Sequence, residues 1–94
     1  MRVRWTTPAA KELTAAYDFV ARDSERAALK MTSKVWKAAQ VLERHPMAGR
    51  KGRVAGTREL VVRGTPFVLA YQIAKKEIWI LAVWHAGRKW PEDF

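Results

Sequence analysis

A histidine near the end of the chain, His85, is the side chain best suited to proton transfer near neutral pH. The residues that follow it include Arg88, Lys89 and Trp90. A cation beside an imidazole can stabilise the transition state formed when a 2′-hydroxyl attacks a phosphodiester. Arg58 and Arg63 are candidates for that charge, and their five-residue spacing places them on opposite faces of one strand, so at most one joins His85. The alternative is a strand-end histidine bonded to backbone.

A loop punctuated by glycine carries three cations within four residues. These are Arg50, Lys51 and Arg53, and Gly49 and Gly52 leave the backbone free to approach a ligand closely. The segment is not a P-loop, because no Gly-Lys-Ser/Thr follows. It is either a binding surface or a flexible loop kept soluble by its charge. Glu59, beside Arg58, could act as a base but is more typical of a salt-bridge partner.

A second group of cations lies on one predicted helix and occupies an arc of roughly 80° on it. The set is Arg26, Lys30, Lys34, Lys37 and Arg44. Few acids separate them, so they do not form a ladder of salt bridges, and their mutual repulsion costs a little. The arc is either a solvated face or a contact for phosphates or an acidic partner protein.

Composition limits the classes of protein to which the chain can belong. It has 94 residues, a net charge of +9, an apolar content of 49% and no Cys. These values favour one globular domain spanning residues 1–94 and exclude disulfide scaffolds and thiolate metal sites. The two histidines are far apart and no acid cluster accompanies them, so we expect no metal and no cofactor. The longest uncharged run, residues 64–74, is too short to cross a membrane, and no export signal is evident, so we expect a cytoplasmic protein.

The elements that must position these residues begin with a short strand. Val3 and Trp5 alternate with arginines, and Thr7-Pro8 predicts a helix cap followed by proline at the first helical position. Two amphipathic helices follow, and their apolar stripes are Leu13, Ala16, Tyr17 and Val20 in the first and Ala28, Met31, Val35, Ala38 and Leu42 in the second. The second helix should end at His45, because Pro46 disfavours helical geometry before it.

The second half of the chain predicts three strands joined by short turns. Their ranges are 57–63, 67–73 and 78–84, and residues 85–94 are expected to be irregular. Trp79 and Trp84 should point to opposite faces of the last strand, being five residues apart. The element order β-α-α-β-β-β predicts an α+β fold in which a helical hairpin covers one face of an antiparallel sheet.

Several segments together resemble the RelE/ParE superfamily of bacterial type II toxins. They are Pro8-Ala9-Ala10, His45-Pro46, Gly49-Arg50, Gly56 to Val62, Thr65 to Tyr71, and Ile78 to His85 with Arg88, Trp90 and Pro91. The resemblance covers nearly the whole chain and implies the same β-α-α-β-β-β fold. It also implies a growth-inhibiting toxin held in a hetero-oligomer by a cognate ParD/RelB-like antitoxin. An acidic antitoxin segment would suit Arg26, Lys30, Lys34 and Lys37.

The superfamily divides by mechanism, and the resemblance leaves two targets open. RelE-like members cut mRNA on the ribosome, and His85, Arg58 and Arg63 would be the catalytic residues of such a site. ParE-like members poison DNA gyrase, and here the contact residues would be Arg50, Lys51, Arg53, Arg88, Lys89 and Trp90. The catalytic tyrosine usual near the end of RelE-like toxins is absent, because no Tyr lies beyond Tyr71. We therefore expect the ParE-like activity, without catalysis.

Overall fold

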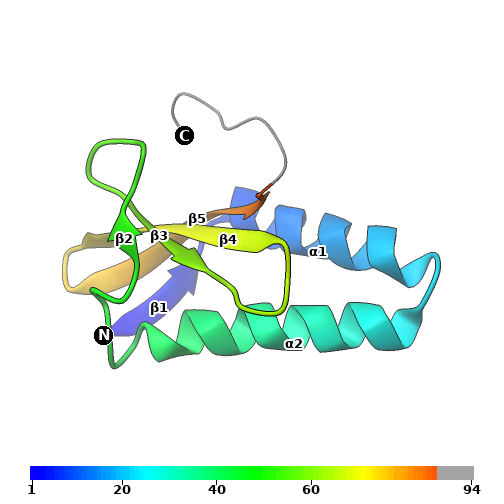
Figure 1. Cartoon of the computed structure of the whole chain (residues 1–94). Helices are drawn as coiled ribbons and strands as arrows, with labels where there is room; N and C mark the ends of the chain where they lie inside the picture. The colour runs from blue at the N-terminus through cyan, green and yellow to red at the C-terminus, as the bar shows by residue number, and fades with distance from the viewer. Residues whose placement is uncertain (87–94) are drawn as a thin grey trace.

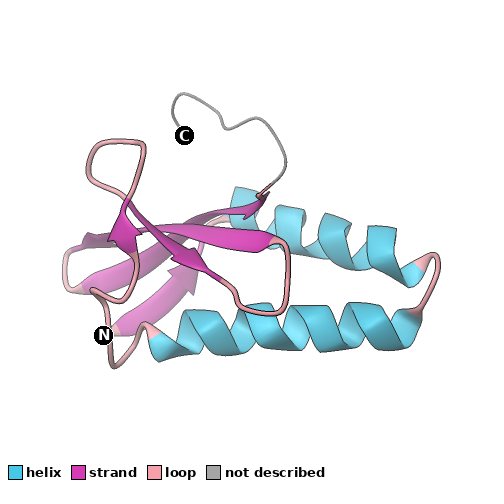
Figure 2. Cartoon of the chain, viewed as in Figure 1, coloured by secondary structure: helices cyan, strands magenta, loops and turns pink. Residues whose placement is uncertain are grey.

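The computed structural model describes residues 1–86, which form two helices and five strands (Figures 1 and 2). The elements, in chain order, are β1 (Arg2–Trp5), α1 (Thr7–Ala21), α2 (Glu25–Val41), β2 (Arg50–Lys51), β3 (Arg58–Val61), β4 (Phe67–Ala74) and β5 (Glu77–His85). The predicted α+β order is confirmed. The short strand β2 was not predicted, because two exposed cations carry no apolar alternation.

The strands form one sheet in the order β1-β5-β4-β3-β2. The β3–β4–β5 meander is antiparallel, as predicted, and β2 adds a further antiparallel pairing with β3. β1 pairs with β5 in parallel, from Arg2 opposite Glu77 to Trp5 opposite Ile80, so the sheet as a whole is mixed. This pairing joins the two ends of the described chain, and the helical hairpin lies between them in sequence.

The helices begin and end at positions that differ slightly from the sequence prediction. Thr6 caps α1, with its hydroxyl accepting from Ala9 N at 3.3 Å, so Pro8 stands at the second helical position and Thr7 at the first. Ser24 caps α2 by accepting from Ala27 N at 3.1 Å. α2 ends at Val41 rather than His45, because residues 42–44 tighten into a turn of i to i−3 bonds.

The core lies between the helical hairpin and one face of the sheet. Val35 and Leu42 are fully buried, as their helical phase predicted. The sheet contributes alternate residues, among them Val62, Phe67, Leu69, Tyr71, Ile78, Ile80 and Val83. Figure 1 shows α2 running below the sheet with α1 alongside α2, and the turn between the helices lies beyond the ends of the strands. The opposite face, which we call the outer face, carries Glu59, Val68, Ala70 and Ala82.

A β-bulge in β5 changes which residues share a face. Ala70 pairs with Ala82, and the next residue of β4, Tyr71, pairs with Ile80, so Leu81 is the extra residue. Trp79 pairs with Gln72, and Trp84 pairs with Val68. Gln72 and Val68 are four residues apart on β4, so they point to the same face. The two tryptophans therefore lie on the same, outer face, and the prediction of opposite faces is wrong because alternation was counted through the bulge.

Candidate functional site

The segment between α2 and β3 carries Arg50, Lys51 and Arg53, and we call it the basic loop. Tyr71 holds this loop against the sheet. Gly49 N donates to the Tyr71 hydroxyl at 2.8 Å, and that hydroxyl donates to Pro46 O at 2.7 Å. Burial raises the pKa of Tyr71, while the Gly49 hydrogen bond and the Arg58 charge oppose that shift. The phenol therefore stays protonated at neutral pH and keeps its donor.

Glu59 holds the second part of the same loop. Its side chain is 2% exposed, its Oε2 accepts from Arg53 N at 2.9 Å, and its Oε1 lies 3.5 Å from Arg50 Nη2. The Arg50 side chain is 64% exposed, so this ion pair is worth little in itself. The hydrogen bond from Arg53 N contributes more to the order of the loop, because it fixes the backbone between Lys51 and Arg53. Glu59 is thus the salt-bridge partner that the sequence suggested, and it also anchors the loop.

Two glycines allow the backbone to pack this tightly. A β-carbon at Gly49 would come within 2.6 Å of the Tyr71 ring, and one at Gly52 within 2.2 Å of the Thr57 hydroxyl. Gly52 N also donates to Thr57 O at 2.8 Å, closing the loop at its base. Both contacts leave no room for a larger residue. The glycines thus serve close packing, and the basic loop presents its cations from a defined backbone.

Arg58 and Lys51 lie side by side at this edge of the sheet. They are directly opposite each other in the β2–β3 pairing. Arg58 Nη1 donates to Gly49 O at 2.7 Å, which fixes the guanidinium against the loop. The two side chains line a hollow of about 280 Å³ together with Gly56, Thr57 and Ile73. This arrangement can bind an anion.

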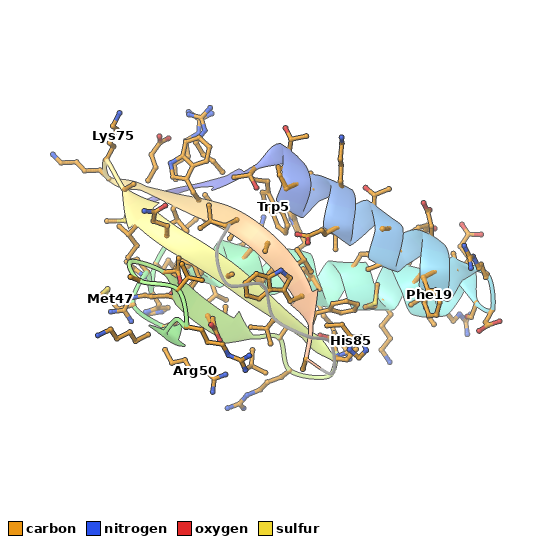
Figure 3. The ribbon with its side chains drawn as sticks, turned by 90° about the horizontal axis from the view of Figure 1, so that it is seen from above. Trp5, Phe19, Met47, Arg50, Lys75 and His85 are labelled. Carbon is orange, nitrogen blue, oxygen red and sulfur yellow. The ribbon has the colours of Figure 1, made fainter. Side chains whose placement is uncertain are left out.

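His85 lies at a distance from these cations. It pairs with Phe67 and contacts its ring edge-on, with 5.7 Å between the ring centroids, on the helix side of the sheet. Arg58 pairs with Tyr71, four residues further along β4, which corresponds to about 13 Å along the strand. Figure 3 shows His85 at the end of β5 and Arg50 at the β2 edge. Arg63 lies beyond the end of β3, in the turn before β4, and is exposed. The structure does not bring Arg58 to His85.

The centre of the outer face offers little for phosphate chemistry. Val68, Ala70 and Ala82 occupy it and are buried, and Glu59 beside them is 3% exposed. Two cations on this face pair with acids: Arg50 with Glu59, and Arg4 with Glu77 at 3.2 Å. The catalytic roles proposed for His85, Arg58 and Arg63 therefore remain predictions, without an assembled constellation among residues 1–86.

The cations of α2 lie on its side away from the core. Arg26, Lys30 and Lys37 are exposed, as is Arg44 just after the helix. Lys34 is half-buried, and its ammonium group lies 3.5 Å from Gly64 O. Within the described part of the chain, none of these cations forms an ion pair with an acid. The face is thus available to an acidic partner, although its role as a contact stays a prediction.

One group of predicted contact residues lies outside the residues that the structure describes. Arg88, Lys89 and Trp90 fall beyond the described residues. Among residues 1–86, no cluster of His, Asp and Glu could hold a metal ion. In the same range, no helix combines the length and apolar content that crossing a membrane requires.

Sequence reasoning did not single out Tyr71 or Thr57, although both organise the basic loop. Tyr71 reads as a core residue of an apolar strand, and nothing near it in sequence indicates that its hydroxyl contacts residues 46 and 49. The one usable signal was the glycine spacing, since Gly49 and Gly52 mark where a backbone approaches another group closely.

Comparison with known proteins identifies the family. The model of the ParE toxin of the type II toxin–antitoxin system parDE matches residues 3–90. This chain belongs to that family. A chain in the structure of the chromosomal ParDE toxin–antitoxin system from P. aeruginosa superimposes with a TM-score of 0.80 at 32% identity, covering 88% of this chain and 92% of that one.

Two curated relatives give the same result. A protein described as toxin Y4kP from Sinorhizobium fredii is 34% identical and covers 97% of this chain and 94% of its own length. Toxin RelE2 from Caulobacter vibrioides is 37% identical and covers 93% of this chain and 97% of its own length. The resemblance to the RelE/ParE superfamily is thereby confirmed, and the chain is a toxin of the type II toxin–antitoxin class, which implies an antitoxin partner.

Proposed function

We propose that this ParE-family toxin inhibits growth by binding DNA gyrase and that it performs no catalysis of its own. The observation that carries the proposal is the separation of His85 from Arg58 and the apolar, buried centre of the outer face. Cleavage of RNA requires a proton-transfer group and cations around one phosphate, each worth about 100-fold or more in rate. Residues 1–86 do not gather such a set.

The exposed cations suit binding rather than turnover. Arg50, Lys51 and Arg53 project from a loop whose backbone is fixed by Glu59 and Tyr71. A pre-organised surface loses little conformational entropy when it binds, which favours a stable inhibitory complex. Together with Arg88, Lys89 and Trp90 of the sequence, these cations are the proposed contacts with the target.

A cognate ParD-like antitoxin would neutralise the toxin through its acidic segment. We assign Arg26, Lys30, Lys34 and Lys37 of α2 to that contact, because they carry positive charge on a face without paired acids in the described chain. Arg26, Lys30 and Lys37 would contribute most, since Lys34 already contacts Gly64 O.

The target is tested by expressing the toxin without its antitoxin and following both nucleic acids. We expect broken DNA and loss of supercoiling by purified gyrase, with intact mRNA. His85→Ala should remain toxic, whereas Lys51→Glu should be less toxic. Lys11→Glu, the same charge reversal on an exposed position of α1, serves as the control and should remain toxic.

A RelE-like ribonuclease would give the opposite pattern. mRNA cut at codon positions on the ribosome, gyrase activity unchanged, and a folded His85→Ala variant without toxicity would overturn the gyrase proposal. Circular dichroism and antitoxin binding of the His85→Ala variant establish that it is folded.

A further inference from the structure

We propose that Lys51 and Arg58 form a binding site for a phosphate group of a DNA backbone at the β2–β3 edge. The inference rests on the proposed function in one respect: gyrase acts on DNA, so a toxin bound to it has a DNA segment within reach. The site itself is argued from the described residues alone.

The first argument is an unfavourable pairing that the fold retains. Lys51 and Arg58 stand directly opposite each other across β2 and β3. Like charges at such positions destabilise a sheet, because their β-carbons are only about 5 Å apart. The adjacent pair, Arg50 opposite Glu59, carries opposite charges instead. No acid within residues 1–86 forms an ion pair with Lys51 or Arg58. A bound anion would remove the repulsion.

The second argument is that the donors are already in place. Arg58 Nη1 is fixed by its 2.7 Å bond to Gly49 O, and Gly49 is in turn bound to Tyr71. A guanidinium has five N–H donors, so donors beyond this bond remain for a ligand. Lys51 adds an ammonium group with three. Arg58 needs little reordering to bind, because its guanidinium and the supporting backbone are anchored.

The third argument is the shape and lining of the space beside them. Lys51, Arg58 and Thr57 line a hollow of about 280 Å³, with Gly56 and Ile73 completing it. No carboxylate lines the hollow, so its chemistry fits an anion and not a metal cation. Gly56 adopts a φ of +80° there and has open space at its β-carbon position, so no neighbouring group fills the hollow at that point.

The surrounding charge favours a polyanion over an isolated phosphate. Arg53 is exposed on the same loop as Lys51, whereas Arg50 is paired with Glu59, and the chain as a whole carries +9. A DNA backbone presents several phosphates to such an edge and releases counterions as each is neutralised. We therefore assign the site to duplex DNA, with the Lys51–Arg58 pair at its centre.

The test measures binding of a fluorescent 20-base-pair duplex to the purified toxin at several salt concentrations, without gyrase. Lys51→Glu should weaken binding about 10-fold or more at 0.1 M salt and make the dependence of log K on log salt shallower by about 1. Lys11→Glu, the matched reversal on α1, should change affinity less than about 3-fold, because only the overall field changes.

Equal losses in the two variants, or an unchanged salt slope for Lys51→Glu, would overturn the site. Tighter binding of a single-stranded RNA of equal length, lost in Lys51→Glu, would also overturn its assignment to DNA. Displacement of the duplex by polyglutamate of equal charge at the same concentration would assign the surface to an acidic protein instead. Because gyrase is absent from the assay, a negative result leaves the gyrase proposal standing. If the toxin binds the duplex as expected but does not inhibit gyrase, the gyrase proposal is refuted and the DNA-binding site stands.

Discussion

At the scale of single residues, Glu12 shows how one side chain completes the sheet where a strand stops. β1 ends at Trp5, opposite Ile80, and β5 continues past it with no neighbouring strand on that side among residues 1–86. Val83 N donates to Glu12 Oε1 at 3.1 Å instead. Burial raises the pKa of Glu12, and the hydrogen bond from Val83 opposes that shift. The carboxyl is thus more easily protonated in the folded protein than in the unfolded chain.

Replacing Glu12 by Gln should therefore change how stability depends on pH. A raised folded-state pKa contributes stability that is fully present below the ordinary pKa of about 4.3 and is lost as pH rises through the folded value. Glutamine keeps the acceptor oxygen and does not titrate. We expect the free energy of unfolding of Glu12→Gln, relative to the parent, to increase between about pH 4 and pH 7.

Urea denaturation at a series of pH values measures this difference. Asp18→Asn, the same acid-to-amide change at an exposed position of α1, should show no comparable increase. A constant difference between Glu12→Gln and the parent across the range would show that folding does not raise the pKa of Glu12.

Residue types indicated some roles from sequence alone and not others. The burial of Val35 and Leu42 followed from helical spacing, because the pattern repeats locally. Tyr71 contacts Gly49, which lies 22 positions earlier in the chain, and Glu12 contacts Val83, which lies 71 positions later. No local pattern encodes contacts between residues so far apart in sequence. His85 could be singled out for its imidazole, but the position of Arg58 relative to it depends on strand register.

At the scale of elements, the β4–β5 turn is held in an unusual backbone conformation. Lys75 and Lys76 form a two-residue connection with φ values of +51° and +61°. This left-handed conformation suits the twist of a hairpin and is normally occupied by Asn-Gly. A residue with a β-carbon costs about 1 kcal/mol or more there.

Lys76→Gly should therefore stabilise the protein by about 1 kcal/mol, because glycine adopts this φ without a steric penalty. Lys76→Ala removes the same charge and long side chain but keeps the β-carbon, so it should give no such gain. Thermal or urea unfolding of the two variants measures the difference. Equal stability of Gly and Ala at this position would mean that the turn relaxes to another conformation in solution.

Helices and strands could be predicted where an apolar pattern repeats over many residues. The predictions failed where pairing with neighbouring strands sets the geometry. Both helices and the three strands of the meander have clear periods, and their ends differ by a few residues where caps and turns intervene. The bulge at Leu81 adds a residue without changing the apolar pattern, so it reversed the predicted face of Trp84 relative to Trp79. The parallel pairing of β1 is set by the long connection through the helices.

At the scale of the whole molecule, charge is distributed unevenly over the fold. Cations gather at the β2–β3 edge and along α2, on separate elements. Val61 of β3 and Phe19 of α1 are exposed at 54% and 65%, so apolar area is also available, and Figure 3 shows Phe19 towards the end of α1 remote from the sheet. A partner could therefore combine charge attraction with apolar contact.

The net charge of +9 should make association with an acidic antitoxin fast and dependent on salt. Electrostatic steering acts before contact, so raising NaCl from 0.05 to 0.5 M should lower the association rate constant about 10-fold or more, with a smaller effect on dissociation. Stopped-flow fluorescence measures both rates. An association rate that is independent of salt would contradict steering by this charge.

Two triple variants separate the overall field from the α2 contact. Reversing Arg26, Lys30 and Lys37 to Glu and reversing Arg2, Lys11 and Lys75 to Glu change the net charge equally, and all six side chains are exposed. Both variants should associate more slowly, because both weaken the field that attracts the partner. Only the α2 variant should also dissociate faster, because its cations touch the antitoxin in the complex. Equal dissociation rates for the two folded variants would place the antitoxin on a face other than α2.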